Sequence, residues 1–136
     1  MCIRDSRWWA PDFVAGPARF ARWLRYRTPV RDAAGLLPRA ALAPLIDLMP
    51  GALVEALGPT PYKFYAPSLD LTMHIIDDTA RDWLLCVVEV PRARVGWAVG
   101  RCEVWDDDGR QLAIGSQAMY LSGVAGVPPT VDATGR

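Results

Sequence analysis

The sequence predicts an α+β domain in which an antiparallel sheet of about five strands wraps round one long, broken helix. Three observations predict this class: an almost wholly apolar stretch from Ala40 to Gly58, an alternating pattern before it, and four strand-like segments after it. A helix that is apolar nearly all round is a buried helix. The chain has 136 residues, which is enough for one domain with a modest core.

The first strand is expected at Arg19–Arg27, where apolar and charged residues alternate and leave one charged face. A loop is expected at Thr28–Gly35. The helix then follows, with Pro38 as a first-turn residue. Pro44 and Pro50 predict that it is broken rather than smooth, because proline removes a helical hydrogen bond. Its apolar residues at helical spacing are Leu42, Leu45, Ile46, Met49 and Leu53, and Gly58, Pro59 and Pro61 end it.

The remaining strands are rich in valine, isoleucine, tryptophan and leucine, which favour a pleated, half-buried surface. They are expected at Ser68–Ile76, Trp83–Val90, Val95–Trp105 and Gln111–Leu121. The run Asp106–Gly109 predicts a hairpin turn between the last two. The spacing and the terminal glutamate of a calcium loop are absent from this run, so a turn is the better interpretation.

The two ends of the chain are expected to lie outside the folded unit, which is assigned to residues 18–121. Residues 1–6, MCIRDS, resemble a translated sequencing-adapter remnant, and we expect an artefactual leader and a missing natural N-terminus. Residues 7–17 are expected to be a linker because proline and glycine punctuate them. Residues 122–136 are expected to be a flexible tail.

Composition excludes several classes of function. The formal net charge is zero, so there is no basic footprint for nucleic acid. No apolar run is long enough to span a bilayer, and no signal peptide is visible, so a cytoplasmic protein without a membrane partner is expected. The cysteines Cys2, Cys86 and Cys102 have no metal or redox spacing, which favours reduced, buried thiols. No cofactor and no metal are predicted.

Asp47 is the first candidate for chemistry. It and Glu55 are the only charges in the apolar stretch, and an ionised carboxylate on a buried helix is costly unless it is hydrogen-bonded or has a task. From the residues alone, a structural acceptor for backbone N–H groups or an arginine remains an equal alternative.

The chain resembles the C-terminal half of the acyl-CoA thioesterase II family, and more broadly the thioesterase-like double-hotdog proteins, over roughly Phe20 to Tyr120. The segments that carry the resemblance are FARWLRYR, APLIDLMPGAL, APSLDLTMH, DWLLCVVEV and GRCEVWDDDGRQLAIGSQ. It implies a hotdog fold and hydrolysis of fatty acyl-CoA thioesters. One departure is that the family often has a His-Arg-Pro run where this chain has Ile76-Asp77-Asp78.

The resemblance also implies the site residues. The family uses an aspartate on the hotdog helix, a serine or threonine on the next strand and a glutamine on the last strand, and these match Asp47, Ser68 and Gln117. In this assignment Asp47 activates a water as general base, while the hydroxyl and the carboxamide hold that water. Asp70 is expected to fix the strand end.

Other interpretations of the same residues remain open. Ser68 alone is typical of a turn after Pro67, and Gln117 alone is compatible with a solvent-facing position. A covalent acyl-Ser68 route is disfavoured because no histidine is placed as its base. A hotdog hydratase needs an Asp–His pair, and the single histidine, His74, is not at that spacing. It is expected to be a packed or surface strand residue.

Two further functional expectations follow. Arg92, Arg94 and Arg101 are candidates for contacts with CoA phosphates, although a solvated strand face is the simpler interpretation. The expected partner is a second hotdog domain, either a missing N-terminal half or another copy of the chain. The alternative function is a non-catalytic acyl-binding or interaction domain.

Overall fold

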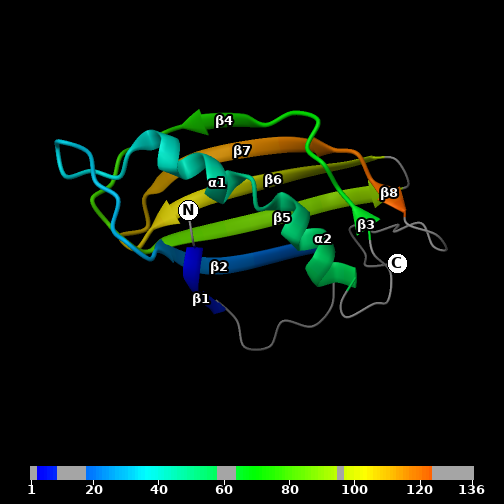
Figure 1. Ribbon diagram of the computed structural model, residues 1–136, viewed down its shortest axis with the longest axis horizontal. Coiled ribbons are helices and arrows are strands. Elements are labelled where there is room, and N and C mark those ends of the chain that lie inside the picture. Colours follow the sequence, from blue (N-terminus) through cyan, green and yellow to red (C-terminus); the bar gives the residue numbers. More distant parts are fainter. Residues whose placement is uncertain (1–2, 9–17, 58–63, 95–96, 124–136) are drawn as a thin grey trace.

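The computed structural model describes residues 3–8, 18–57, 64–94 and 97–123. Within these residues a six-stranded sheet, with the order β1-β2-β5-β6-β7-β4, curves round the helices (Figure 1). Every pairing in it is antiparallel. Its strands are β1 (Ile3–Trp8), β2 (Ala18–Tyr26), β4 (Thr72–Ile75), β5 (Leu84–Arg94), β6 (Trp97–Asp106) and β7 (Gln111–Met119). A separate two-stranded sheet joins β3 (Phe64–Tyr65) to β8 (Ser122–Gly123).

The predicted helix is present and is broken, as Pro44 and Pro50 indicated. It consists of a 3-10 turn (Arg39–Leu42), α1 (Ala43–Ile46) and α2 (Met49–Leu57). Pro44 lies in the first turn of α1, and Pro50 is the second residue of α2. Both prolines therefore occupy first-turn positions, where their missing N–H groups cost no helical hydrogen bond.

The five predicted strands are confirmed, and two differences concern β1 and β5. Strand β1 adds a sixth strand along β2, within the segment expected to be leader and linker. Strand β5 continues past Val90 because a bulge between Glu89 and Arg92 leaves Pro91 unpaired with β6, where it needs no N–H. Residues 9–17 and 124–136, which belong to the expected linker and tail, lie outside the described residues.

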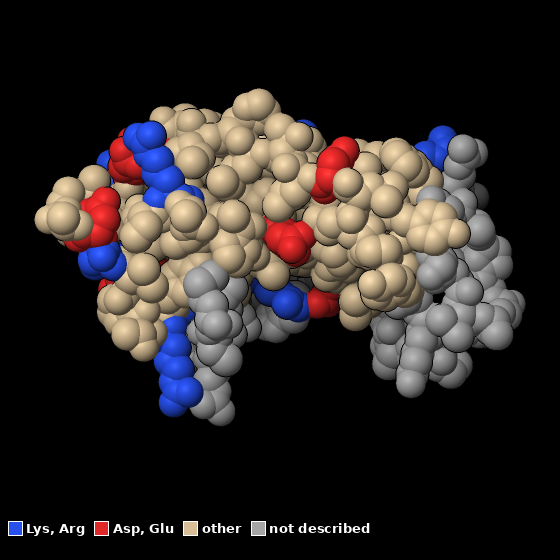
Figure 2. Space-filling view, turned by 45° about the horizontal axis from the view of Figure 1, so that its top comes forward, with Lys and Arg blue, Asp and Glu red and all other residues tan. Residues whose placement is uncertain are grey.

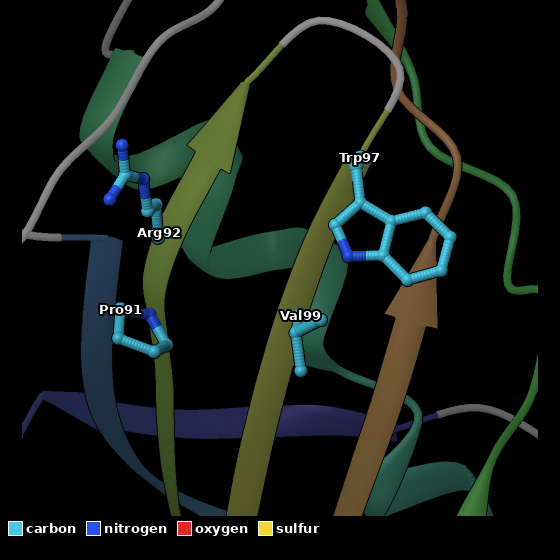
Figure 3. Close-up of a pocket in the computed structure, with 4 residues that line it drawn as sticks. All are labelled: Pro91, Arg92, Trp97 and Val99. Carbon is cyan, nitrogen blue, oxygen red and sulfur yellow. The ribbon is translucent and has the colours of Figure 1, made fainter.

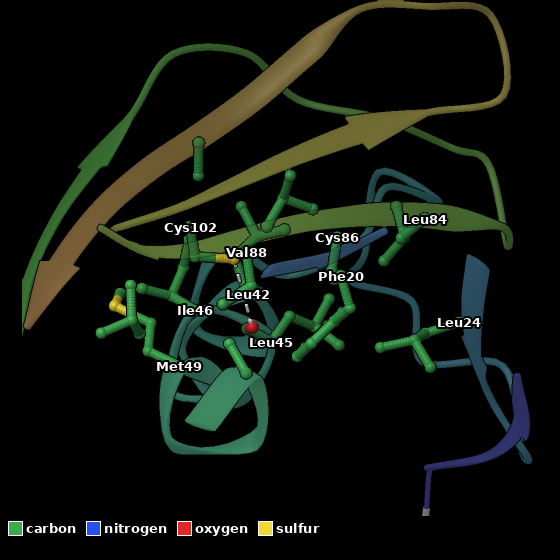
Figure 4. Packing of buried hydrophobic residues seen from close by; sticks show 14 of the residues in the cluster. Phe20, Leu24, Leu42, Leu45, Ile46, Met49, Leu84, Cys86, Val88 and Cys102 are labelled. Carbon is green, nitrogen blue, oxygen red and sulfur yellow. Dashed lines mark hydrogen bonds between the residues drawn. The ribbon is translucent and has the colours of Figure 1, made fainter. Parts of the chain in front are cut away.

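The core fills the space between the helices and the concave face of the sheet (Figure 4). The side chains of Leu45, Ile46 and Met49 are at most 1% exposed. They pack on the inward residues of β5 and β6, including Cys86 and Cys102, which are free and buried. A hydrogen bond with Cys102, together with burial, raises the pKa of the Cys86 thiol well above its ordinary value. The two cysteines thus behave as small buried hydrophobes.

One ion pair fixes α2 to the sheet. Arg22 points to the concave face of β2, stacks on the ring of Phe20 and donates a hydrogen bond to Glu55 of α2. Both charged side chains are partly buried, at 28% and 25% exposed. Glu55, the second charge of the apolar stretch, therefore has a structural partner.

The hairpin turn between β6 and β7 is confirmed at the predicted residues. Gly109 adopts φ 79°, in the left-handed region that glycine favours, and its N–H donates to the Asp106 carbonyl. The Asp106 side chain is 1% exposed and accepts hydrogen bonds from the backbone N–H groups of Asp108 and Arg110. It also accepts from the Thr79 hydroxyl at 2.9 Å and from the Arg110 guanidinium.

Ion pairs gather at this end of the molecule, and Figure 2 shows acidic and basic side chains side by side there. They include Arg31–Asp82, Arg39–Asp78 and Arg81–Asp108. Exposed pairs of this kind contribute little stability each. None of the described helices is both long and apolar enough to cross a membrane.

We predict that Asp106→Asn destabilises the fold by about 1–3 kcal/mol at pH 7, because it leaves buried partners without their acceptor. Burial raises the pKa of the Asp106 carboxyl. The hydrogen bonds from Arg110, Thr79 and Asp108 and the charge of Arg110 lower it by more, so the pKa lies below its ordinary value. A depressed pKa adds to the free energy of unfolding. This added stability is fully present above the unfolded-state pKa of about 3.9 and is lost as pH falls through the folded-state pKa.

Urea unfolding of the wild type and the variant at pH 7 and pH 3 measures this effect. The difference between them should shrink at pH 3, and exposed Asp107→Asn should change stability by less than about 0.5 kcal/mol at either pH. An Asp106→Asn variant as stable as the wild type at pH 7 would show that the network contributes nothing.

Candidate active site

Asp47 lies at the break in the helix. It is the C-cap of α1, with φ −76° and ψ 23°, and α2 begins two residues later at Met49. The expectation of a carboxylate on a buried helix is wrong in one respect, because the Asp47 side chain is exposed while Ile46 and Met49 are buried. The break is the reason: Asp47 ends a helix and turns to the rim of the core instead of lying within it.

Gln117 comes from the concave face of β7. The alternation of the strand places Ser116 outside and Gln117 inside, where it is 1% exposed. The solvent-facing alternative for Gln117 is therefore wrong. A buried carboxamide needs partners for both of its N–H groups and for its oxygen.

Ser68 completes the cluster from the segment between the helices and β4. It forms an isolated bridge with Met119, two residues past Gln117 on β7. The Gln117 Nε2 donates to Ser68 Oγ at 2.5 Å and also to Asp47 Oδ1. The Ser68 hydroxyl is 3.4 Å from the same Asp47 oxygen. The three residues predicted from distant parts of the sequence thus meet at one place.

Asp70 explains why β4 is shorter than the predicted strand. Its carboxylate accepts the Ala118 N–H at 2.8 Å, and the Leu69 N–H donates to the Ala118 carbonyl at 2.8 Å. A side chain here takes the place of a ladder hydrogen bond, so regular pairing starts only at Thr72. Asp70 therefore fixes the segment that carries Ser68 against β7, as expected.

One atom of the cluster has no protein partner. The Gln117 Oε1 is buried and receives no hydrogen bond from the described residues. Buried polar atoms are nearly always paired, and an exception at a polar cluster marks a place for a water or a ligand group. The cluster therefore presents a carboxylate, a hydroxyl and a carbonyl oxygen within one small space.

His74 does not join this cluster. It is exposed and pairs with Ile114 across β4 and β7, whereas Ser68 bridges to Met119 on the same strand. Five residues of an extended strand span about 16 Å. The expectation that His74 is a strand residue without a catalytic role is in accord with this position.

A pocket of about 450 Å³ lies elsewhere, on the convex face of β5 and β6, lined by Pro91, Arg92, Trp97 and Val99. Figure 3 shows that the Arg92 guanidinium and the Trp97 ring point in different directions rather than into a shared space. Val99 is exposed, and the adjacent Gly100 faces the core opposite Gln117. The pocket and the polar cluster are therefore on opposite faces of the sheet.

The three arginines that are candidates for contacts with CoA phosphates have different surroundings. Arg101 is engaged by Glu89 at 3.3 Å and by Glu103 at 3.5 Å, as expected for a solvated strand face. The side chain of Arg94 lies outside the described residues. Among the residues that are described, no group of histidine, cysteine, aspartate or glutamate side chains could hold a metal ion.

Sequence reasoning missed two glycines beside the cluster. Gly100 pairs with Gln117 across β6 and β7, and Gly115 lies two residues before Gln117 on the same face. Both are buried. A glycine inside a strand pattern is the available signal, because it indicates close approach of another part of the backbone or of a ligand.

Two solved structures with similar folds are described as thioesterases. A thioesterase from Novosphingobium aromaticivorans, described as putative, shares 32% identity with a TM-score of 0.67, over 87% of this chain and 42% of that one. The chain thus spans less than half the length of that relative. A hypothetical thioesterase from Streptococcus pneumoniae, solved with coenzyme A, shares 15% identity with a TM-score of 0.68, over 88% of this chain and 87% of that one. This second likeness shows the fold alone.

A conserved protein from Pseudomonas aeruginosa adds 22% identity and a TM-score of 0.65, over 79% of this chain and 83% of that one. We found no match among curated proteins. The family model of the acyl-CoA thioesterase C-terminal domain matches residues 3–121. The hotdog fold and the family resemblance are thereby confirmed, and the chain belongs to the acyl-CoA thioesterase C-terminal domain family.

Proposed function

We propose that this domain hydrolyses fatty acyl-CoA thioesters, with Asp47 activating a water that attacks the thioester carbonyl carbon. The observation that carries the proposal is the meeting of Asp47, Ser68 and Gln117, in which one buried amide donates to both other side chains. The family match supports thioester hydrolysis as the reaction.

Asp47 is suited to the role of general base. Its side chain is exposed at the rim of the core, so a water and a substrate can reach it. Gln117 holds one carboxylate oxygen, Oδ1, and no hydrogen bond from a described residue reaches the other. The second oxygen can therefore take the proton that the attacking water loses.

Ser68 and Gln117 are suited to hold the water rather than to attack. A serine nucleophile needs a short hydrogen bond to its base, of about 2.6–3.2 Å. The distance from Ser68 Oγ to Asp47 is 3.4 Å, and the same oxygen already accepts the Gln117 N–H. A hydroxyl and the free Gln117 carbonyl oxygen offer a donor and an acceptor to one water.

Charge that develops on the thioester oxygen needs fixed donors. The N-terminus of α2 follows Asp47 by two residues, and the positive end of a helix dipole favours negative charge. This placement supports water attack at the helix break.

A hydratase is the less favoured activity. Such chemistry needs a histidine beside the aspartate, and the single histidine of the chain is exposed at β4, opposite Ile114. Ile114 lies on the convex face of β7, while Gln117 and its Asp47 contact lie on the concave face. Paired residues share a face, so His74 and Asp47 are on opposite sides of the sheet.

The family match and the structural neighbours support the proposed substrate class. Two of the similar solved structures, from Streptococcus pneumoniae and Bacillus halodurans, are described as holding coenzyme A. Acyl-CoA is therefore the proposed substrate.

A second hotdog domain is the proposed partner. The relative from Novosphingobium aromaticivorans is more than twice as long as the part that this chain matches. Strand β4 is an edge strand whose neighbourhood carries exposed Leu71, Ile75 and Ile76. Unpaired apolar edges drive association.

We predict that Asp47→Asn lowers thioesterase turnover by about 10²–10⁴-fold while the protein stays folded, because asparagine keeps the shape and loses the base. Turnover is measured with medium-chain acyl-CoA and a thiol reagent, and folding by circular dichroism. Retention of full turnover would show that Asp47 does not activate the water.

A matched pair of serine variants distinguishes the loss of a hydroxyl at the site from a general effect of removing a serine. Ser68→Ala should lower turnover, whereas Ser116→Ala, on the exposed face beside Gln117, should leave it unchanged. Absence of turnover in the wild type, both alone and paired with a second hotdog domain, would favour the non-catalytic acyl-binding alternative.

Assembly gives a further prediction. The chain should self-associate through the β4 edge, and Leu71→Lys with Ile75→Lys should shift it to monomer, because charged side chains at an edge strand oppose pairing. Light scattering of both forms measures this. A wild-type chain that is monomeric and fully active would show that one hotdog domain is sufficient.

A further inference from the structure

Two glycines leave the inward faces of β6 and β7 without side chains beside Gln117. Gly115 lies two residues before Gln117 on β7, and Gly100 lies directly opposite Gln117 on β6. Every other inward residue near them carries a side chain into the core. The two glycines therefore form a notch in the sheet, with the catalytic amide between them.

The helix junction fills this notch. A Cβ added at Gly115 would lie 2.1 Å from Ile46 Cγ2, which is far inside contact distance, and 3.0 Å from the Thr72 carbonyl oxygen. A Cβ added at Gly100 would lie 3.0 Å from both Cβ and Sδ of Met49. Ile46 ends α1 and Met49 begins α2, so the residues in the notch stand on either side of Asp47.

We infer that Gly115, supported by Gly100, is a positioning residue that sets the distance between the Asp47 carboxylate and the Gln117 amide. Asp47 directly follows Ile46 in the chain. A methyl group at position 115 would have to push Ile46 away by roughly 1 Å or more to restore ordinary contact, and Asp47 would move with it. The donor and acceptor of an N–H···O hydrogen bond lie about 2.7–3.2 Å apart, so a shift of this size would weaken the hydrogen bond from Gln117 Nε2 to Asp47 Oδ1.

The two glycines should differ in effect. At Gly115 the obstacles are the γ2 methyl group of Ile46, a fully buried and β-branched side chain, and the β4 backbone. At Gly100 one of the nearest atoms is the sulfur of a flexible methionine side chain, which can turn aside more easily. Gly115 is therefore the more sensitive position.

The activity experiment uses Gly115→Ala, and this arm rests on the proposed function. A misplacement of about 1 Å at a catalytic group can cost about 10²-fold in rate, so kcat should fall by about 10²-fold while KM stays near the wild-type value. Gly100→Ala should cost only severalfold. Gly51→Ala, in α2, is the matched control, because its added Cβ would meet only the Phe20 ring, at 3.3 Å.

Rescue distinguishes positioning from simple loss of stability. Ile46→Ala removes the Cγ2 atom that a Cβ at position 115 meets, so Gly115→Ala with Ile46→Ala should recover kcat in large part. Ile46→Val keeps a γ-carbon at that place and should not rescue. The crowding against the Thr72 carbonyl remains in both, so recovery is expected to be incomplete.

A second readout does not need turnover. The side-chain NH₂ resonances of Gln117, assigned by their loss in Gln117→Met, report the hydrogen bond to Asp47. Their chemical shifts should change in Asp47→Asn and in Gly115→Ala, and should return towards the wild-type values in the rescued double variant. An inactive wild type that shows this pattern would overturn the proposed function and retain the positioning role.

Two results would overturn the inference. The first is a folded Gly115→Ala that keeps both the wild-type kcat and the wild-type chemical shifts of the Gln117 side-chain NH₂ group. The second is equal rescue by Ile46→Ala and Ile46→Val. If Gly115→Ala does not fold, Gly100→Ala decides: a decrease in kcat with changed chemical shifts of the Gln117 side-chain NH₂ group supports the inference, and wild-type values for both contradict it.

Discussion

The hydrogen bonds of the Gln117 amide are the interaction on which the site depends. One of its N–H groups reaches Asp47 at the helix break, and the other reaches Ser68 in the segment before β4. Because the amide is buried, losing either partner leaves a polar group unsatisfied, with a cost of about 1–3 kcal/mol. The same geometry that the fold needs for this amide also brings a carboxylate and a hydroxyl together.

The helix break has a structural cause and a chemical consequence. Prolines in the first turns of the two helices allow the chain to end one helix at Ile46 and to start another at Met49. Asp47 lies in the interval, so it is presented at the rim of the core with its carboxylate facing Gln117 and Ser68. On a continuous helix, Asp47 would be either buried in the core or exposed on the solvent face.

Much of the fold follows from the sequence, because the arrangement of apolar residues along the chain indicates where its strands and its helix lie. Alternation located β2, a high content of strand-forming apolar residues located β5, β6 and β7, and the Asp106–Gly109 run located the hairpin. The boundaries of β4 did not follow, since Asp70 replaces a ladder bond there by a side-chain hydrogen bond. Strand β1 was also not predicted, because its sequence was set aside as foreign.

The candidate site followed from the resemblance rather than from the residues singly. Asp47 drew attention as a charge in an apolar stretch, but its exposure depends on the angle of the helix break, which spacing alone does not give. Gln117 was ambiguous because strand alternation does not say which face is inside. The helix junction contacts Gly100 and Gly115, which are far from it in the sequence. Patterns in a single sequence carry little information about such contacts.

The central claim is that Asp47 and Gln117 act as one unit in thioester hydrolysis. A double-mutant cycle on kcat/KM with Asp47→Asn and Gln117→Met tests it most directly, using acyl-CoA and the chain with the proposed second hotdog domain. Residues that act as a unit are strongly non-additive. The account predicts that the double variant is about as slow as the slower single variant. Losses that multiply would contradict it, because they would mean that the two side chains contribute independently.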